Sequence, residues 1–291
     1  MVNMETLKKL REKTNAGMMD CRKALDSTNW DLAAAEEWLR ENGISKAAKK
    51  ADRIAAEGLV TIASNGKSSV LVELNSETDF VAKNEKFVKL LNEIAAAILK
   101  ANPKSNDDAL KVKLASGQTI EEACVAATST IGEKVSFRRF FEVHAGKDEV
   151  LGNYVHANGL IAAIVRIKGT SEEIARNVAM HLAAMNPEFI FEKDMSAERV
   201  KHIKEAFETP KDFDKKPEKI QKLIVDGWYA KQLSEIVLLD QSFIIEDSKS
   251  VGKYLEDHKS TLIEAKRFEV GEGIEKVQSN FAEEVMSFVN K

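Results

Sequence analysis

The side chains that most often carry catalysis or bind metals are few in this sequence and widely spaced. The five histidines and two cysteines are His144, His156, His181, His202, His258, Cys21 and Cys124. None of them has the short spacing that is typical of metal ligands. There is no glycine-rich phosphate loop, since Gly271 and Gly273 form an isolated pair. We therefore expect no catalytic residue, no metal site, no cofactor and no covalent chemistry.

One loop does combine unusual residue types. Between a strand-like and a helical pattern, the chain reads Ser-Glu-Thr-Asp-Phe-Val-Ala-Lys-Asn over 76–84. One interpretation is helix capping, with Thr78 or Asp79 as the N-cap and Phe80 as a hydrophobic staple into the core. The other is an apolar wedge beside a charge, both presented to a partner. The sequence leaves the two interpretations open.

Other candidate residues have ordinary structural explanations. Cys21 lies in the apolar stripe of a short helix, and His181 lies on a helix face rich in alanine and methionine. Both are expected to be core residues. Met18 and Met19 are adjacent and cannot both point inward from a short turn, so one should be exposed. Methionine suits an adaptable protein-binding surface.

Length and composition exclude several broad classes. The 291 residues carry 43 Lys and Arg against 47 Asp and Glu, a net charge of −4, with 44% hydrophobic residues. The hydrophobic fraction supports packed cores, and the length favours two or three domains. The near balance of charge disfavours nucleic-acid binding through overall basicity. Two cysteines, no signal core and no apolar run of about 20 residues predict a cytoplasmic protein.

The N-terminal residues 1–52 are expected to form three short helices that pack as a small bundle. Asn29 is expected to cap the third helix, and Gly43 to end it. The basic run over 46–53 is expected to be a solvated face. A bundle this small is marginally stable alone, so it should be tethered to the rest of the chain.

The hydrophobic period changes after the bundle. Strands are predicted over 59–62 and 69–74, joined by a hairpin turn at Asn65-Gly66. A long amphipathic helix is predicted over 85–101, and a further strand over 135–143.

An internal repeat links the two halves of the chain. Residues 69–75 resemble residues 162–168, and residues 92–103 resemble residues 176–187, including a final Asn-Pro. The first copy holds nine extra residues between its strand and its helix. Two strand–helix copies predict two similar α+β subdomains, each an antiparallel sheet with helices on one face.

The remaining elements are predicted from local patterns. Two amphipathic helices joined by a polar turn, Pro210 to Pro217, predict a helical hairpin. Further expectations are strands over 235–239 and 243–245, a helix over 251–255 capped by Ser250, and an amphipathic helix from Ile274 to Phe288.

Four separated motifs resemble those of one protein family. They are LREKTNAGMMDCRKAL (10–25), TDFVAKNEKF (78–87), VLGNYVH (150–156) and RFEVGEGIEKV (267–277). In this order they are similar to translation elongation factor Ts, over essentially the whole chain. Members of that family are guanine-nucleotide exchange factors of elongation factor Tu.

The resemblance implies an α+β multidomain architecture. Applied to this chain, it comprises a ubiquitin-associated-like three-helix bundle (1–52), a core N subdomain (53–145), a core C subdomain (146–192 and 234–273), a helical hairpin or coiled coil inserted at 193–233, and a C-terminal helical module (274–291).

The resemblance also implies the residues that act on elongation factor Tu. The family's exchange motif, which disturbs the partner's Mg²⁺ site, matches Thr78, Asp79, Phe80 and Val81. The family's partner-binding residues match Arg11, Met18, Met19 and His156.

Two positions depart from the family pattern. Asn15 stands where glycine is common, although asparagine can adopt the same left-handed backbone. Ala157-Asn158 follows His156 where a Gly-Arg pair is common, which alters the surroundings of that contact.

The predicted function is therefore promotion of GDP release from elongation factor Tu, without direct nucleic-acid or membrane binding and with self-association left open. Two alternatives come from other classes. The chain could be an interaction scaffold that recruits partners through its ubiquitin-associated-like bundle. It could also be an enzyme that uses Asp79 and His156 as an acid–base pair.

Overall fold

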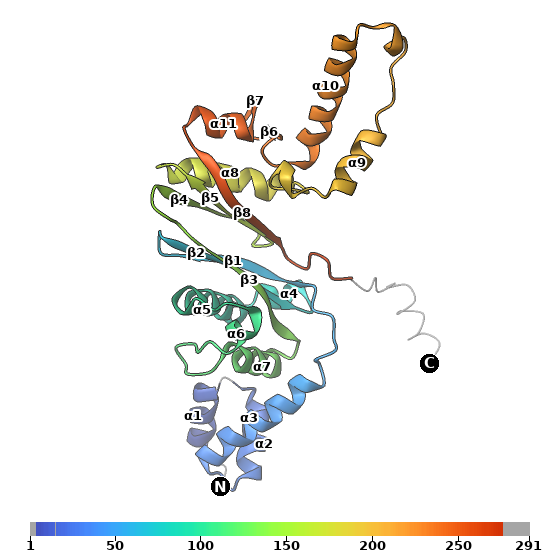
Figure 1. The fold of residues 1–291 in the computed structure, drawn as a ribbon. Helices are drawn as coiled ribbons and strands as arrows, with labels where there is room; N and C mark the ends of the chain where they lie inside the picture. The colour runs from blue at the N-terminus through green and yellow to red at the C-terminus, as the bar shows by residue number, and fades with distance from the viewer. Residues whose placement is uncertain (1–3, 15, 276–291) are drawn as a thin grey trace, which may run out of the picture. The chain divides into compact units, whose positions relative to one another are not determined.

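The computed structural model describes residues 4–14 and 16–275, and its contacts divide the chain into two compact units (Figure 1). The first unit contains the chain up to residue 63, residues 72–140 and the chain from residue 269; the second contains residues 64–71 and 141–268. Both mix helices with strands, in agreement with the predicted α+β class. Asn15 and residues 276–291, which include most of the expected C-terminal helix, lie outside the described residues.

Three helices form the N-terminal bundle of the first unit. They are α1 (Met4–Thr14), α2 (Met18–Ser27) and α3 (Leu32–Ala48). Leu10, Cys21 and Leu25 are fully buried between these helices. The predicted core position of Cys21 is thus confirmed, and burial raises the pKa of its thiol, which keeps it protonated and unreactive.

The predicted boundaries of the third helix are wrong at both ends. Asp31 rather than Asn29 is the N-cap, and its carboxylate accepts a 2.7 Å hydrogen bond from the backbone N–H three residues later. Asn29 has a left-handed backbone (φ 52°) in the preceding turn. Helix α3 continues through Gly43, which lies against Ser129 of another helix; a Cβ here would be 3.3 Å from the Ser129 hydroxyl. The absent side chain therefore serves close helix packing and not helix termination.

A three-stranded sheet follows the bundle. Strands β1 (Glu57–Ser64), β2 (Ser68–Ser76) and β3 (Val135–His144) lie in the order β1-β2-β3. The predicted turn is confirmed, since Asn65 Oδ1 accepts backbone hydrogen bonds from Lys67 and Ser68, and Gly66 has φ +84°. Helices α5 (Glu85–Ala101), α6 (Asn106–Leu110) and α7 (Ile120–Ile131) cover one side of this sheet (Figure 1). The bounds of α5 agree with the prediction, whereas the sequence patterns had predicted neither α6 nor α7.

A buried charge cluster ties the strands of the first unit together. The Glu73 carboxylate, on β2, has no exposed surface and accepts hydrogen bonds from Arg138 Nη1 (2.8 Å) and Arg139 Nε (2.6 Å) on β3. It also accepts one from the backbone N–H of Gly271 (2.9 Å). Gly271 has φ +74°, and a Cβ there would lie 2.2 Å from the Ala56 carbonyl oxygen, so only glycine allows this approach.

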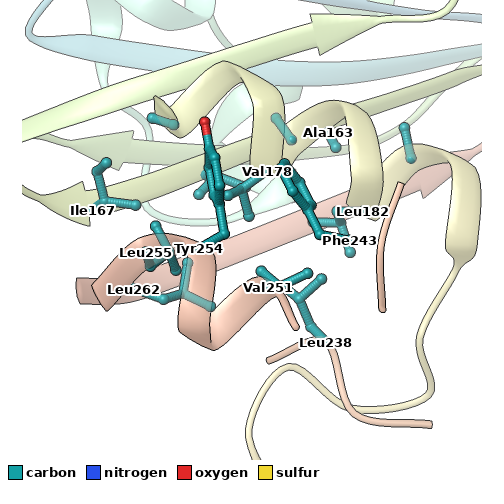
Figure 2. Packing of buried hydrophobic residues seen from close by; sticks show 14 residues of the cluster. Ala163, Ile167, Val178, Leu182, Leu238, Phe243, Val251, Tyr254, Leu255 and Leu262 are labelled. Atoms are coloured by element: carbon teal, nitrogen blue, oxygen red, sulfur yellow. The ribbon is translucent and has the colours of Figure 1, made fainter. Parts of the chain in front are cut away.

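The second unit contains a sheet of its own. Strands β4 (Glu149–Val155), β5 (Ile161–Lys168) and β8 (Thr261–Glu269) lie in the order β4-β5-β8, and β4 pairs antiparallel with β5. Helix α8 (Glu172–Met185) packs on β4 and β5. Figure 2 shows the core of this unit, where the rings of Phe243 and Tyr254 stack with centroids 4.2 Å apart among aliphatic side chains.

The remaining elements of the second unit are mostly helical. They are the 3₁₀ turns η1 (Glu192–Asp194) and η2 (Phe213–Lys215), helices α9 (Ala197–Glu205), α10 (Glu218–Ile236) and α11 (Val251–Asp257), and strands β6 (Ser242–Phe243) and β7 (Glu246–Ser250). The two helices joined by a proline-bounded loop are present as predicted. Ser250 caps α11 as predicted, since its hydroxyl accepts a hydrogen bond from Lys253 N (3.2 Å).

The strands predicted over 235–239 and 243–245 are mostly wrong. Only Val237, in an isolated parallel bridge with Phe189, and Phe243, in β6, pair as strand residues. Helix α10 extends to Ile236, and Leu233 and Val237 are buried in one cluster with Ile203 of α9. A short run of branched apolar residues suits a strand or a buried helix end equally well, and the tertiary contact decides between them. Strand β6 ends at Phe243, and the next two residues form the turn to β7.

The two repeat copies share a helix ending. Asn102 after α5 and Asn186 after α8 both have a left-handed backbone (φ 50° and 44°), and a proline follows each of them. The copies differ before the helix, where residues 77–84 separate β2 from α5 but only residues 169–171 separate β5 from α8. The nine extra residues are therefore a short helix-bearing loop together with additional strand and helix length.

His181 is a satisfied core histidine, as predicted. Its side chain is fully buried on α8, with Nε2 3.0 Å from Gln241 Oε1 and Nδ1 accepting a hydrogen bond from Ile244 N (3.2 Å). Burial lowers the pKa of this imidazole, so the neutral form is favoured. Both ring nitrogens are used for structure, and none is left for catalysis.

A glycine-to-alanine pair tests how α8 packs on the sheet. At Gly152 on β4, an added Cβ would lie 2.0 Å from the backbone carbon of Ala175, so Gly152→Ala should lower the free energy of unfolding by about 1–3 kcal/mol. Gly227→Ala, in the middle of α10 with nothing within 4 Å, is the control and should be neutral or stabilising by about 1 kcal/mol. Chemical denaturation followed by circular dichroism compares them, and equal midpoints would contradict this packing.

Candidate functional site

A short loop between β2 and α5 presents the first candidate residues. This loop, residues 77–84, is called the Phe80 loop below, and it contains the one-turn helix α4 (Asp79–Ala82). Thr78 is the N-cap of α4, with its hydroxyl accepting a 3.5 Å hydrogen bond from Val81 N. Val81 and Ala82 are buried. The capping interpretation is thus confirmed for Thr78, and Val81 attaches the loop to the core.

Phe80 does not act as a hydrophobic staple, and that part of the prediction is wrong. Its side chain is 80% exposed, the most exposed of the large apolar residues described. The Lys83 ammonium lies 6.0 Å from the ring centroid. An aromatic ring held in water at a capped turn contributes little to folding, and its apolar surface is available for binding.

Asp79 lies beside Phe80 on the same turn. Its carboxylate accepts a 2.7 Å hydrogen bond from Lys83 Nζ, one helical turn away, and both side chains are largely exposed. This hydrogen bond holds the pKa of Asp79 below its usual value, so the group is an anion at neutral pH. The loop therefore presents an apolar ring and a negative charge side by side.

The Phe80 loop is anchored by a carboxylate distant in the sequence. Glu133 Oε2 accepts a hydrogen bond from Thr78 N (3.0 Å), and the Thr78 hydroxyl lies 2.9 Å from Glu133 Oε1. Charged hydrogen bonds of this kind are stronger than neutral ones. No sequence pattern predicted this contact, because the two residues are 55 positions apart.

A second exposed surface lies on the N-terminal bundle. Met18 and Met19 begin α2 and are 51% and 65% exposed, so both face solvent where at least one was expected to. Arg11, near the end of α1, is also exposed. These three residues belong to the first unit, as does the Phe80 loop.

His156 follows β4 in the second unit and is exposed. Its Nδ1 lies 3.1 Å from the Tyr154 hydroxyl, and its backbone N–H donates to the Ile161 carbonyl across the hairpin. Asp79 and His156 thus each have their own partner, Lys83 and Tyr154, within their own units.

The structure also exposes an apolar pair that the sequence patterns missed. Ile244 and Ile245 are each 50% exposed at the turn between β6 and β7. They were predicted as strand residues, although two isoleucines before Glu246-Asp247, at a strand end, could have signalled an exposed apolar turn.

The described part of the chain offers neither a metal site nor a membrane span. No group of three or more His, Cys, Asp or Glu in residues 4–14 and 16–275 could hold a metal ion. No described helix combines the length and apolar character that crossing a bilayer requires. Cys124 is buried, and burial raises the pKa of its thiol to about 12.

The fold and these surfaces define a class: a protein that presents exposed apolar and charged side chains from well-anchored turns, as factors that bind other proteins do. The comparisons with known proteins specify the family. The family model for elongation factor Ts matches residues 77–272.

Full-length relatives agree with the family model. The chain is 51% identical over 284 residues to elongation factor Ts of Mycoplasmopsis synoviae, covering 98% of this chain and 97% of the relative. It is 49% identical to that of Mycoplasmopsis pulmonis (98% and 97% covered) and 46% identical to that of Acholeplasma laidlawii (98% of each). The chain belongs to the elongation factor Ts family, whose members are nucleotide exchange factors for elongation factor Tu in translation elongation.

The ion pair on α4 yields a testable titration. Replacing Lys83 by methionine removes the hydrogen bond that contributes most to lowering the pKa of Asp79, so this pKa should rise toward its usual value. In the unchanged protein the ion pair is present at neutral pH and is lost as the pH falls through the lowered pKa. Side-chain NMR titration measures both values. Lys86→Met, on the exposed start of α5, is the control and should leave the Asp79 titration unchanged.

Proposed function

We propose that this chain accelerates GDP release from elongation factor Tu by placing Phe80 and Asp79 against the part of the partner that holds Mg²⁺ and phosphate. The observation that supports this most directly is the 80% exposure of Phe80 on a capped and anchored turn, in a chain of this family. The role is one of exchange and involves no covalent chemistry. Its place is the cytoplasm, where translation elongation proceeds.

The free energy of such an exchange can be bounded. Lowering the affinity of elongation factor Tu for GDP a thousandfold requires about 4 kcal/mol of coupling between the binding of GDP and the binding of this chain. Burying the Phe80 ring in a pocket that opens only when the Mg²⁺ side is disturbed would supply about 1.5–3 kcal/mol. The Asp79 carboxylate would add to this by competing for donors or for Mg²⁺-bound water.

The other exposed surfaces have a different role in this proposal. Arg11, Met18 and Met19 on the bundle, together with His156 in the second unit, hold the partner whether or not nucleotide is bound. Binding energy common to both states shifts no equilibrium between them, but it lowers the concentration at which the factor acts. Docking and nucleotide displacement are thus assigned to different residues.

The proposal includes the division of the chain into five parts. The bundle (1–52), the core N subdomain (53–145), the core C subdomain (146–192 and 234–273), the helical hairpin (193–233) and the C-terminal module (274–291) are proposed as its modules.

An interaction scaffold is the second candidate function. The exposure of both Met18 and Met19 favours a scaffold as much as it favours an exchange factor. A scaffold would bind elongation factor Tu without changing its nucleotide. GDP release from purified elongation factor Tu, with and without this chain, separates the two functions. An unchanged release rate at saturating concentration would leave only the scaffold.

Phe80→Ala should slow the maximal rate of GDP release by about 10- to 100-fold, because the ring's burial energy is lost. Binding to nucleotide-free elongation factor Tu should weaken only modestly. Stopped-flow release of a fluorescent GDP analogue measures the rate. Met185→Ala, which removes a 46% exposed apolar side chain at the end of α8, is the control and should match the unchanged protein. A Phe80→Ala protein with normal release would refute the wedge.

The double variant Met18→Ala, Met19→Ala should weaken docking in every state. Losing two half-exposed methionines from an interface costs about 2 kcal/mol together. The concentration for half-maximal release should therefore rise about 30-fold, while the maximal rate stays the same. The same titration measures both quantities, and a fall in the maximal rate alone would contradict this division of roles.

A further inference from the structure

A tight turn between α7 and β3 meets the Phe80 loop. This turn consists of Gly132, Glu133 and Lys134. The Glu133 carboxylate accepts hydrogen bonds from the Thr78 backbone N–H (3.0 Å) and from its hydroxyl (2.9 Å). The contact is reciprocal, because Lys134 N donates a 2.6 Å hydrogen bond to Glu77 Oε1. Each segment thus supplies one carboxylate and one backbone donor to the other.

The same turn meets the chain that leaves the N-terminal bundle. Lys134 Nζ donates to the carbonyl oxygens of Ala51 (2.5 Å) and Arg53 (2.9 Å), and Lys50 Nζ donates to the Gly132 carbonyl. Arg53 Nη1 also pairs with Glu77 Oε2 at 3.1 Å. One three-residue turn therefore contacts both the base of the Phe80 loop and the segment that follows α3.

We propose that Glu133 and Lys134 are positioning residues for nucleotide exchange. Glu133 sets the orientation of the turn that carries Phe80, and Lys134 sets the position of the bundle that carries Met18 and Met19. This inference rests on the proposed function, since it concerns the same exchange step. It adds two residues that touch neither nucleotide nor metal and act through the loop and the bundle.

The physical need for such support comes from the Phe80 loop itself. Helix α4 has only four residues, and a helix of one turn has no stability of its own. The Phe80 ring is 80% exposed, so the position of its Cα and the rotamers open to it depend chiefly on the backbone of residues 78–82. The anchors of this backbone are the two buried side chains after Phe80 and the Glu133 carboxylate before it.

The bonds to Thr78 are strengthened by the charge of the carboxylate. Thr78 offers two donors, its N–H and its hydroxyl, and its hydroxyl oxygen also accepts from Val81 N. Glu133 Oε2 lies 3.0 Å from both donors, and a hydrogen bond to a charged acceptor is about twice as strong as one to a neutral amide oxygen. Glu133→Gln therefore preserves volume, removes the charge and replaces one acceptor oxygen by an amide group.

The first measurement is GDP release by Glu133→Gln at increasing concentrations of the variant. The maximal rate should fall about tenfold, because a displaced Phe80 no longer meets its pocket. The concentration for half-maximal release should stay within twofold of the unchanged protein. Glu93→Gln, at an exposed position of α5 with only a 3.8 Å ion pair to Lys89, is the matched control and should leave both values unchanged.

The second measurement combines Glu133→Gln with Phe80→Ala. If Glu133 acts through the ring, the double variant should release GDP at the rate of Phe80→Ala alone, because nothing remains to be positioned. A loss of general stability would instead reduce the rate by the same factor in both backgrounds. This non-additivity distinguishes a positioning role from a merely structural one.

Lys134→Met should change the half-maximal concentration and not the maximal rate of GDP release, the opposite of Glu133→Gln. It removes the Nζ hydrogen bonds to residues 51 and 53 and keeps the backbone bond from Lys134 N to Glu77. The concentration for half-maximal release should therefore rise about tenfold, with an unchanged maximal rate. Equal effects of Lys134→Met and Glu133→Gln on both quantities would overturn the assignment.

A second pair of variants keeps the inference testable if Glu133→Gln does not fold. Thr78→Val removes the hydroxyl that binds Glu133 and should lower the maximal rate as Glu133→Gln does. Thr61→Val, which removes a hydroxyl of β1 that lies 3.2 Å from Asn92 Oδ1, is the matched control and should release GDP normally. If the unchanged protein fails to accelerate GDP release, the proposed function and this inference both fail. If it accelerates release and Glu133→Gln or Thr78→Val matches it, only this inference is overturned.

Discussion

The buried Glu73 carboxylate is the constraint on which the first unit depends. Two arginines of β3 and the backbone N–H of Gly271 neutralise and solvate it where no water reaches. A buried charge that loses one partner is strongly destabilising, so β2, β3 and the segment after β8 must be assembled together. Strand β2 ends at Ser76, three residues after Glu73, and residues 77 and 78 follow directly. The charge cluster thus determines where the Phe80 loop begins.

From that starting point the loop is held by polar contacts at its base and apolar contacts after its tip. Glu133 binds Thr78 before the exposed ring, and Val81 and Ala82 are buried after it. Phe80 is left in water, where it stabilises the fold little and leaves its apolar surface accessible. This arrangement suits an exchange factor, because only an interaction that differs between the partner's states can shift nucleotide affinity.

Local structure was predictable wherever the signal lay within a few residues. The bounds of α5, the Asn65-Gly66 turn and the Ser250 cap all follow from side chains that bond to nearby backbone. Predictions failed where a distant contact overrode the local signal. Gly43 resembles a helix end but is a packing position against α7, and 235–239 resembles a strand but begins with the end of α10, whose Ile236 packs against the cluster shared with α9. The candidate residues of the site were predicted by motif, and their surroundings were not.

The sequence by itself determined the family and the α+β class, and it narrowed the helix cap in this loop to Thr78 or Asp79, because each depends on residue types at short spacing. Only the tertiary structure decided whether Phe80 is a core staple or an exposed ring. Its local pattern, an aromatic residue two positions after a threonine cap, is compatible with both. The choice depends on which neighbour fills the core and on Glu133, 55 residues further along the chain. Contacts across such separations are selected by the packing of whole elements, which no short sequence pattern records.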